Sequence, residues 1–264
     1  MEQLFIVKYN AKIPNTSVNV TQESFLLKTF KLSVSLAILA TLFYLLISLT
    51  VNFIVSHLSI EQEKKLLNFI TYDIDLNGKE DKHLSKIKNK LASCTNIPYK
   101  TKIFISSEDN IANAYALPGG SIYITQKLMD ELKSESELIF IIAHELSHFK
   151  NKDHLKGLGN SLFFASIGLI LGEEYSSLLN YTIGIGGAKY SQNNEIAADK
   201  SGLELMQCAY GSVHGATNFF ERMGKNENKW KYFLASHPDF HKRIEEMKKV
   251  IKEQNMNSSK TISF

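Results

Sequence analysis

The most constraining feature of this chain is one uncharged stretch near its beginning. Residues 32–56 read LSVSLAILATLFYLLISLTVNFIVS, which is 25 residues without an aspartate, glutamate, lysine or arginine. At a rise of about 1.5 Å per residue, a helix of this length crosses a bilayer core of about 30 Å. A helix in the core of a soluble protein is the alternative, but such helices rarely stay apolar on every side over this length. We therefore expect Leu32 to Ser56 to be one transmembrane helix.

The expected span divides the 264-residue chain into three parts. Residues 1–31 form a short leader that is too small to enclose its own core. Residues 32–56 are a retained anchor, because the leader and the apolar run are longer than those of a cleavable signal peptide and no small-residue cleavage site follows. Residues 57–264 form the main domain, which has the length of an ordinary globular domain.

The charges around the span indicate its orientation. Lys28 and Lys31 precede it, whereas Lys64 and Lys65 follow it beside two glutamates. The positive-inside rule then favours a cytosolic N-terminus and an exported main domain, as in a single-pass protein of the bacterial inner membrane. The net charge of +3 comes from scattered lysines and is too mild to indicate a nucleic-acid partner.

The main domain is expected to be an α+β fold that is mainly helical. The spacing of apolar residues, the acidic residues after Ser59 and the alternating runs distinguish helices from strands. The expected elements are helices over 59–70, 79–94, 125–154 and 193–206, a strand over 99–106, and a hairpin over 113–125. The long helix over 125–154 is expected to break near residues 134–136.

Two features of the main domain leave alternatives open. Residues 158–171 are apolar but only 14 residues long, which favours a buried helix over an interfacial segment or a second span. Cys94 and Cys208 lie far apart and lack the spacing of a metal motif. Buried thiols are the favoured interpretation, with one disulfide as the alternative if the domain lies outside the cytosol.

The stretch IIAHELSHFKNK, from Ile141 to Lys152, indicates chemistry. Residues four apart on a helix share a face, so His144 and His148 can direct both imidazoles at one zinc ion. Glu145 then stands beside the metal, where it can accept a proton from a water molecule. The alternative is an ordinary amphipathic helix that happens to carry histidines.

A catalytic zinc site needs a third protein ligand and one open position. The best candidates are in NNEIAADKSGLELM, where Glu195 and Asp199 lie four apart on an expected helix. One carboxylate can bind zinc, and the other can accept the remaining N–H of a ligand histidine and fix its tautomer. A solvated acidic face is the alternative for this pair.

Four blocks of the main domain occur in the order typical of one known family. They are NAYALPGGSIYIT, IIAHELSHFKNKDH, NNEIAADKSGLELM with AYG after it, and HPDFHKRI. Over Ser59 to Met247 the chain resembles the membrane-associated zinc metallopeptidases of peptidase family M48, with its HtpX, Oma and CAAX-prenyl-protease relatives. The resemblance implies a zincin-like metallopeptidase domain with a small hairpin and edge strand, and one Zn²⁺ per chain.

The resemblance also implies a role for each matching residue. It makes His144, His148 and Glu195 the metal ligands and Glu145 the catalytic glutamate. It makes Asp199 the acid that supports a ligand histidine. The family usually has an acid–Ala–Asp run here, whereas Glu195 is followed by IAAD, but the ligand spacing is retained.

Two further parts of the site follow from the same resemblance. One is a strand that borders the cleft and pairs with the substrate backbone, formed by Asn113, Ala114, Tyr115 and Ala116. The other is His237, which matches a histidine that approaches the metal or the substrate in some relatives. The alternative for His237 is a helix-start residue ahead of Pro238.

The expected function is that of a membrane-anchored zinc-dependent endopeptidase. The chain as given lacks the multiple spans and long repeat domain of other family branches and resembles single-anchor or peripheral members. Their substrates tend to be membrane-associated or misfolded proteins. Two alternatives remain, a catalytically silent zinc-holding chaperone or binding module tethered to the membrane, and a small-molecule zinc hydrolase. Tight zinc binding without peptide cleavage would favour the binding module.

Overall fold

The computed structural model describes residues 24–70, 78–97, 99–106, 111–156, 191–225 and 230–262. It divides into two compact units, Met1–Leu49 and Thr50–Phe264. The predictions for residues 1–23 of the leader and for the second apolar stretch, residues 158–171, lie outside the described residues.

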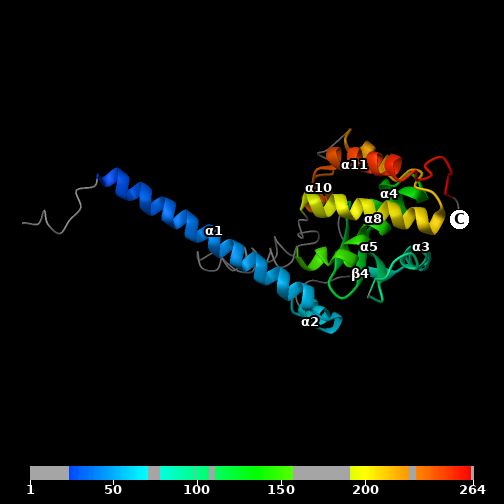
Figure 1. Ribbon diagram of the computed structural model, residues 1–264. Coiled ribbons are helices and arrows are strands. Elements are labelled where there is room, and N and C mark those ends of the chain that lie inside the picture. Colours follow the sequence, from blue (N-terminus) through cyan, green and yellow to red (C-terminus); the bar gives the residue numbers. More distant parts are fainter. Residues whose placement is uncertain are drawn as a thin grey trace, which may run out of the picture. The chain divides into compact units, whose positions relative to one another are not determined.

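Helix α1, Phe25–His57, contains the expected span and is drawn as one continuous helix in Figure 1. Its part Phe25–Ile47 is long and apolar enough to cross a membrane, and none of its most apolar window is buried. Leu36 is 64% and Leu42 58% exposed, whereas a helix of a soluble core would bury one side. The helix begins before Leu32 because Phe25 to Lys31 carries no residue that stops a helix.

The second unit contains a four-stranded sheet in the order β1-β2-β4-β3. Its strands are β1 (Gly78–Glu80), β2 (Lys102–Ser106), β3 (Ala114–Leu117) and β4 (Ser121–Thr125). Strand β4 runs parallel to β2 and antiparallel to β3, so β3 and β4 form the expected hairpin. Gly119 and Gly120 turn the chain with φ of 85° and 97°, which glycine adopts without strain. Strand β3 therefore lies at an edge of the sheet.

The helices of this unit include those predicted over 59–70, 79–94, 125–154 and 193–206, whereas the three helices described after Tyr210 were not predicted. The described helices are α2 (Ile60–Ile70), α3 (Lys82–Ala92), α4 (Gln126–Glu131), α5 (Glu135–Asn151), α8 (Gln192–Tyr210), α9 (Asn218–Met223), α10 (Lys231–Ser236) and α11 (Phe240–Glu253). Helix α3 starts later than predicted, because Asp81 caps it by accepting from the Leu84 amide. The expected break in the long helix lies just before Ser134, which caps α5 by accepting from the Glu137 amide.

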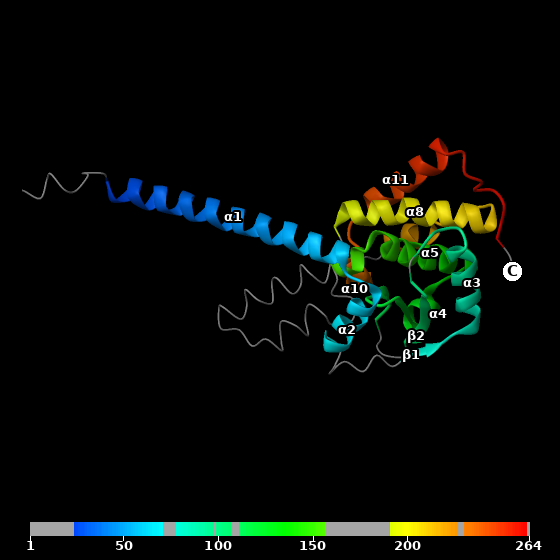
Figure 2. The same cartoon turned by 60° about the horizontal axis from the view of Figure 1, so that its bottom comes forward.

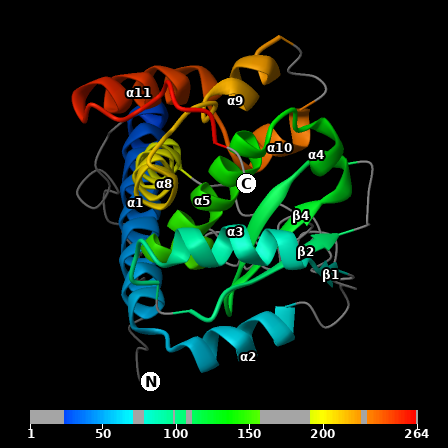
Figure 3. The ribbon, with the colours of Figure 1, turned by 90° about the vertical axis from the view of Figure 1, so that its right-hand side faces the viewer.

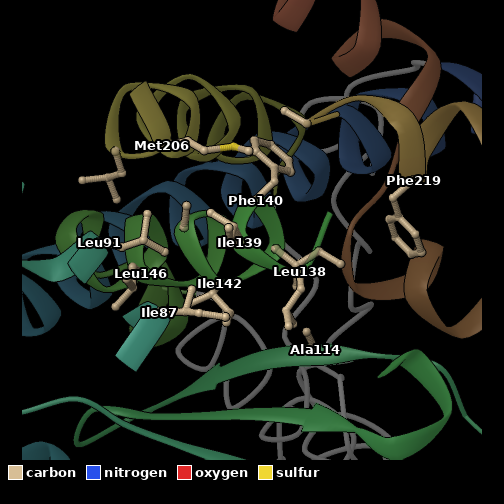
Figure 4. Packing of buried hydrophobic residues seen from close by; sticks show 14 of the residues in the cluster. Ile87, Leu91, Ala114, Leu138, Ile139, Phe140, Ile142, Leu146, Met206 and Phe219 are labelled. Carbon is tan, nitrogen blue, oxygen red and sulfur yellow. The ribbon is translucent and has the colours of Figure 1, made fainter. Parts of the chain in front are cut away.

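Helix α5 is at the centre of this unit. From α11 through α8 and α5 to the sheet, the elements form successive layers (Figures 1 and 2). Helix α3 packs against both α5 and β2, as Figure 3 shows from the side. In Figure 4, Phe140 of α5 reaches toward Met206 of α8, and Ile142 meets Ile87 of α3. The α+β fold, mainly helical with a small sheet, is thus confirmed.

Gly202 explains how closely α8 approaches α5. A Cβ atom at this position would lie 3.3 Å from the His144 amide nitrogen and 3.4 Å from Cε2 of Phe140. Any larger residue would push α8 away from the backbone of α5. The close crossing brings the first turns of α8, with Glu195 and Asp199, beside the two histidines of α5.

The structure decides between the two interpretations of the cysteines, which the sequence left open, and excludes free buried thiols. Cys94, just after α3, and Cys208, in the last turns of α8, form a disulfide with a sequence separation of 114 residues. The fold places α3 beside α8, and this proximity is tertiary, so the cysteine spacing gave no indication of it. The alternative of one disulfide is the correct one.

Candidate metal centre

Four buried side chains from three elements converge at one point. His144 and His148 come from α5, Glu195 from α8, and His237 from the residue that ends α10. Each offers one ligand atom, and these atoms all lie within 4.8 Å of one another. Imidazole nitrogen and carboxylate oxygen are the ligands zinc takes in catalytic sites. The structure thus brings together the three predicted ligands and His237.

The two histidines of α5 face each other through their Nε2 atoms, which are 3.0 Å apart. Nδ1 of His144 lies 2.9 Å from Asp199 Oδ1, and Nδ1 of His148 lies 3.2 Å from Asp153 Oδ2. An ionised carboxylate only accepts hydrogen bonds, so each Nδ1 carries a proton and each Nε2 presents its lone pair in the neutral ring. Two facing lone pairs require a positive charge between them.

The pKa shifts of His148 and His144 also indicate a positive charge between the two rings. Burial alone would lower the pKa of His148, but hydrogen bonds to Asp153 and Glu195 outweigh it and raise the pKa to about 10. Burial lowers the pKa of His144 despite the nearby carboxylates. In the absence of a metal, one additional proton between the two Nε2 atoms would supply that positive charge. A metal cation can replace that proton, and the residues present fit a zinc ion.

Glu195 is fully buried and ionised. Its oxygens lie 3.3 Å from Nε2 of His148 and 3.5 Å from Nε2 of His144. Burial would raise its pKa, but the charge of Arg243, with Nη1 2.6 Å from Oε2, holds the pKa well below its usual value. An ionised carboxylate is the form that binds a metal.

Arg243 also holds Asp199 and was not predicted as a site residue. Its Nε and Nη2 donate to the two oxygens of Asp199 over 2.7 and 2.8 Å, a bidentate pair. Its guanidinium lies 4.6 Å from the centre of the Phe220 ring, and the side chain is fully buried. Arg243 belongs to the block HPDFHKRI, which matches the family. That match did not indicate that Arg243 contacts Glu195 and Asp199 of α8.

Asp153 is the second residue that sequence reasoning missed. It follows α5, and Lys152 between them has a φ of 54°, which turns the chain back toward His148. Asp153 thereby supports His148 as Asp199 supports His144. Nothing in the sequence indicates that Lys152 adopts a left-handed conformation. The contact between Asp153 and His148 could therefore not be predicted.

Glu145 lies beside the converging atoms. It is 1% exposed, and its Oε2 has no hydrogen-bond partner among the described residues. Its Oε1 is 3.6 Å from Nε2 of His237, too long for a hydrogen bond. An unpartnered buried carboxylate oxygen is costly, and a bound water or substrate group would account for it.

His237 joins this group to the edge strand. Its Nδ1 lies 3.1 Å from Glu195 Oε2, and its Nε2 lies 3.2 Å from the Ala114 carbonyl. Nδ2 of Asn113 is buried without a hydrogen-bond partner among the described residues. Tyr115 stacks on Tyr123 instead, with ring centres 5.6 Å apart, and Ala116 pairs with Ile122 further along β3. Of the four predicted strand residues, Asn113 and Ala114 therefore lie nearest to His237.

Comparisons with known proteins identify relatives of this chain. Residues 78–251 match the family model described as Peptidase family M48. Mitochondrial metalloendopeptidase OMA1 of Arabidopsis thaliana is 30% identical over 139 residues, which are 50% of this chain and 28% of the relative. OMA1 of Schizosaccharomyces pombe is 28% identical over 155 residues, 55% of this chain and 45% of the relative.

Metalloprotease LoiP of Escherichia coli is 27% identical over 172 residues, which are 61% of this chain and 67% of the relative. The chain thus spans less than half the length of these OMA1 relatives and about two thirds of LoiP. The matched region includes α5, α8 and most of α11, and hence every side chain of the candidate centre. The chain belongs to peptidase family M48.

Proposed function

We propose that this chain is a membrane-anchored endopeptidase in which His144, His148 and Glu195 hold one zinc ion. The observation that carries the proposal is the pair of Nε2 atoms facing each other beside a buried, ionised Glu195. Each histidine is fixed in that orientation by a carboxylate on its other nitrogen. Three protein ligands leave one position open, as catalytic zinc requires.

Glu145 is the proposed general base. When bound, zinc would polarise the scissile carbonyl and lower the pKa of a water molecule toward about 7. Glu145, with its unpartnered Oε2, accepts the proton of the attacking water and then delivers it to the leaving amine. The residue is next to both histidines on α5 but outside the converging set of ligand atoms. Proton transfer, not metal binding, is therefore its role.

His237 is the proposed electrophilic partner. If it bound the metal as a fourth protein ligand, the position that water needs would be filled. Its Nε2 lies near the Ala114 carbonyl and 3.6 Å from Glu145 Oε1. From there its N–H can donate to a substrate carbonyl oxygen as negative charge develops on it.

The proposed substrate is an extended polypeptide. Among the described residues β3 pairs with β4 alone, so its other edge can accept a peptide as an added strand. Strand addition depends on backbone hydrogen bonds more than on the substrate's side chains. Unfolded or membrane-associated proteins near the anchor are therefore the proposed substrates. The same edge argues against a small-molecule hydrolase, and the open position and unpartnered Glu145 argue against a silent zinc-binding module.

The proposal is tested by a graded series on α8. We expect Glu195→Ala to lose most zinc and all cleavage, because one of three protein ligands is gone. We expect Asp199→Asn to cost about 10–100-fold in metal affinity or activity, as removal of a histidine's partner does elsewhere. Glu204→Gln is the matched control, since Glu204 accepts an exposed hydrogen bond from the side-chain amide of Gln254. Zinc content and peptide cleavage are measured for the full chain in detergent.

Two outcomes of this series contradict the proposal. If Asp199→Asn matches Glu204→Gln in both measurements, Asp199 has no role in the metal centre. If Glu195→Ala retains full zinc, the third ligand must be another residue. Tight zinc in the unmodified chain with no cleavage of any unfolded protein would favour the binding module.

We also propose that residues 1–31 are a leader, residues 32–56 the anchor in a bacterial inner membrane, and residues 57–264 an exported peptidase domain. The disulfide between Cys94 and Cys208 supports export, because disulfides persist in oxidising compartments. In spheroplasts, we expect added protease to remove a tag fused after Phe264 while a cytosolic marker stays intact. A tag that survives until the membrane is permeabilised would reverse the orientation.

A further inference from the structure

Helix α2, which follows α1 in the chain, carries a buried carboxylate. Glu63 is fully buried, whereas Glu61, Lys64 and Lys65 of the same helix are exposed. A buried carboxylate is costly unless it is well partnered. The hydroxyl of Tyr99 donates to Glu63 Oε1 over 2.7 Å, and the amide of Gly119 donates to Oε2 over 3.4 Å.

A third contact comes from the turn after α5. Nε2 of His154 lies 3.5 Å from Oε2 of Glu63, and it has no hydrogen-bond partner of its own among the described residues. In the same turn, the ammonium of Lys152 donates to the carbonyl of Leu58, just before α2, over 3.1 Å. The segment that contains Leu58 and helix α2 therefore contacts this turn twice, through Leu58 with Lys152 and through Glu63 with His154.

The residues held by α2 belong to the two sides of the proposed site. Asp153, between Lys152 and His154, is the residue that supports His148. Gly119 is in the tight turn between β3 and β4, and β3 is the proposed substrate strand. Glu63 thus connects the turn behind a metal ligand with the hairpin that borders the substrate.

The surroundings make this connection stiff. The ring of His154 packs against Phe149, with centroids 4.8 Å apart, and against Tyr99 at 5.8 Å. Burial would raise the pKa of Glu63, but the nearby His154 ring and the hydrogen bond from the Tyr99 hydroxyl outweigh it and hold the pKa below its usual value. An ionised carboxylate among aromatic rings has few alternative positions. Glu63 therefore also restricts the positions of Tyr99, Gly119 and His154.

We infer that Glu63 is a positioning residue that makes tight metal binding depend on the docking of α2. It acts through the turn 152–154, which sets Asp153 and hence the direction of His148. The inference rests on the proposed zinc site, because it needs His148 to be a ligand. Changes in the position of α2, which follows α1 in the chain, would therefore alter the zinc affinity of the centre.

The test uses the full chain in detergent. The zinc dissociation constant is measured by competition with a chromophoric chelator for the unmodified chain, Glu63→Gln and Glu61→Gln. We expect Glu63→Gln to weaken zinc about three- to tenfold, less than the 10–100-fold cost of losing a histidine's direct partner. Glu61→Gln, an exposed change on the same helix, should have no effect. The visible spectrum of the Co²⁺-loaded protein should shift in Glu63→Gln alone.

A double-mutant cycle tests the route. If Glu63 acts through Asp153, Glu63→Gln should weaken zinc less in an Asp153→Asn background than in the unmodified chain. Fully additive effects would overturn the route. Tyr99→Phe, which removes one hydroxyl, provides a milder variant should Glu63→Gln fail to fold, and an unchanged zinc affinity in it would then overturn the inference.

Thermal unfolding of the metal-free proteins separates positioning from plain stability. A Glu63→Gln chain that unfolds earlier but binds zinc like Glu61→Gln would overturn the inference and leave the zinc site standing. A His148→Ala chain that binds zinc as tightly as the unmodified chain would instead overturn the proposed site, and the inference with it.

Discussion

Glu145→Gln is expected to abolish peptide cleavage while zinc stays bound and the fold is unchanged. The amide has nearly the shape of the carboxylate but cannot accept the proton of the attacking water. Loss of a positioned general base typically costs about 10²–10⁴-fold in rate. Metal binding should survive, because the side chain is not among the four whose ligand atoms converge.

Removal of the charge should also not harm the fold. Oε2 of Glu145 has no hydrogen-bond partner among the described residues, and its Oε1 is 3.6 Å from the nearest nitrogen of His237. Glutamine fills the same space and carries no charge that burial would penalise. We therefore expect the thermal midpoint of the metal-free variant to equal or exceed that of the unmodified chain.

The experiment compares three chains with equal zinc content. Cleavage of an unstructured peptide is followed for the unmodified chain, Glu145→Gln and the exposed control Glu204→Gln. Activity of Glu145→Gln within a few-fold of the control would mean that another group takes the proton. Lost activity together with lost zinc would mean that Glu145 belongs to the ligand set, which the geometry does not support.

Sequence reasoning reached those parts of the centre that depend on spacing within one helix. His144 and His148 share a face of α5, and Glu195 and Asp199 share a face of α8, because a helix repeats every 3.6 residues. Helix α8 can cross α5 at this point because Gly202 has no side chain. The spacing of residues along a single helix does not predict such a crossing. The pairing of the two faces therefore came from the family resemblance.

The residues missed were those that reach the site from other elements. Arg243 comes from α11 and Asp153 from a left-handed turn, so neither stands at a fixed distance from a ligand in the sequence. Glu63 was read as an acid of the first turn of α2, and its burial depends on Tyr99, Gly119 and His154, which are far from it in the chain. Such contacts are fixed by the tertiary fold rather than by local pattern.

Arg243→Met is expected to be the most destabilising single change in the centre. Methionine retains an unbranched apolar side chain to fill the space beside Phe220 but removes the positive charge. Glu195 and Asp199, 0% and 2% exposed, would then share the site without their cation. Removing one partner of a buried ion pair typically costs about 3–5 kcal/mol. The free energy of unfolding of the metal-free chain, from denaturant titration, should fall by that amount.

Two further variants show whether charge or geometry matters at this position. Arg243→Lys keeps the charge but loses the bidentate hydrogen bonds to Asp199, so we expect an intermediate loss of stability. Arg222→Met is the matched control, because Arg222 pairs with Glu137 at the start of α5 and is 32% exposed. It should lower stability but leave zinc affinity unchanged, whereas both Arg243 variants should weaken zinc by loosening Glu195. If Arg243→Met unfolds like the unmodified chain, the two carboxylates are balanced by another cation, and the proposed support of the metal ligands by Arg243 is wrong.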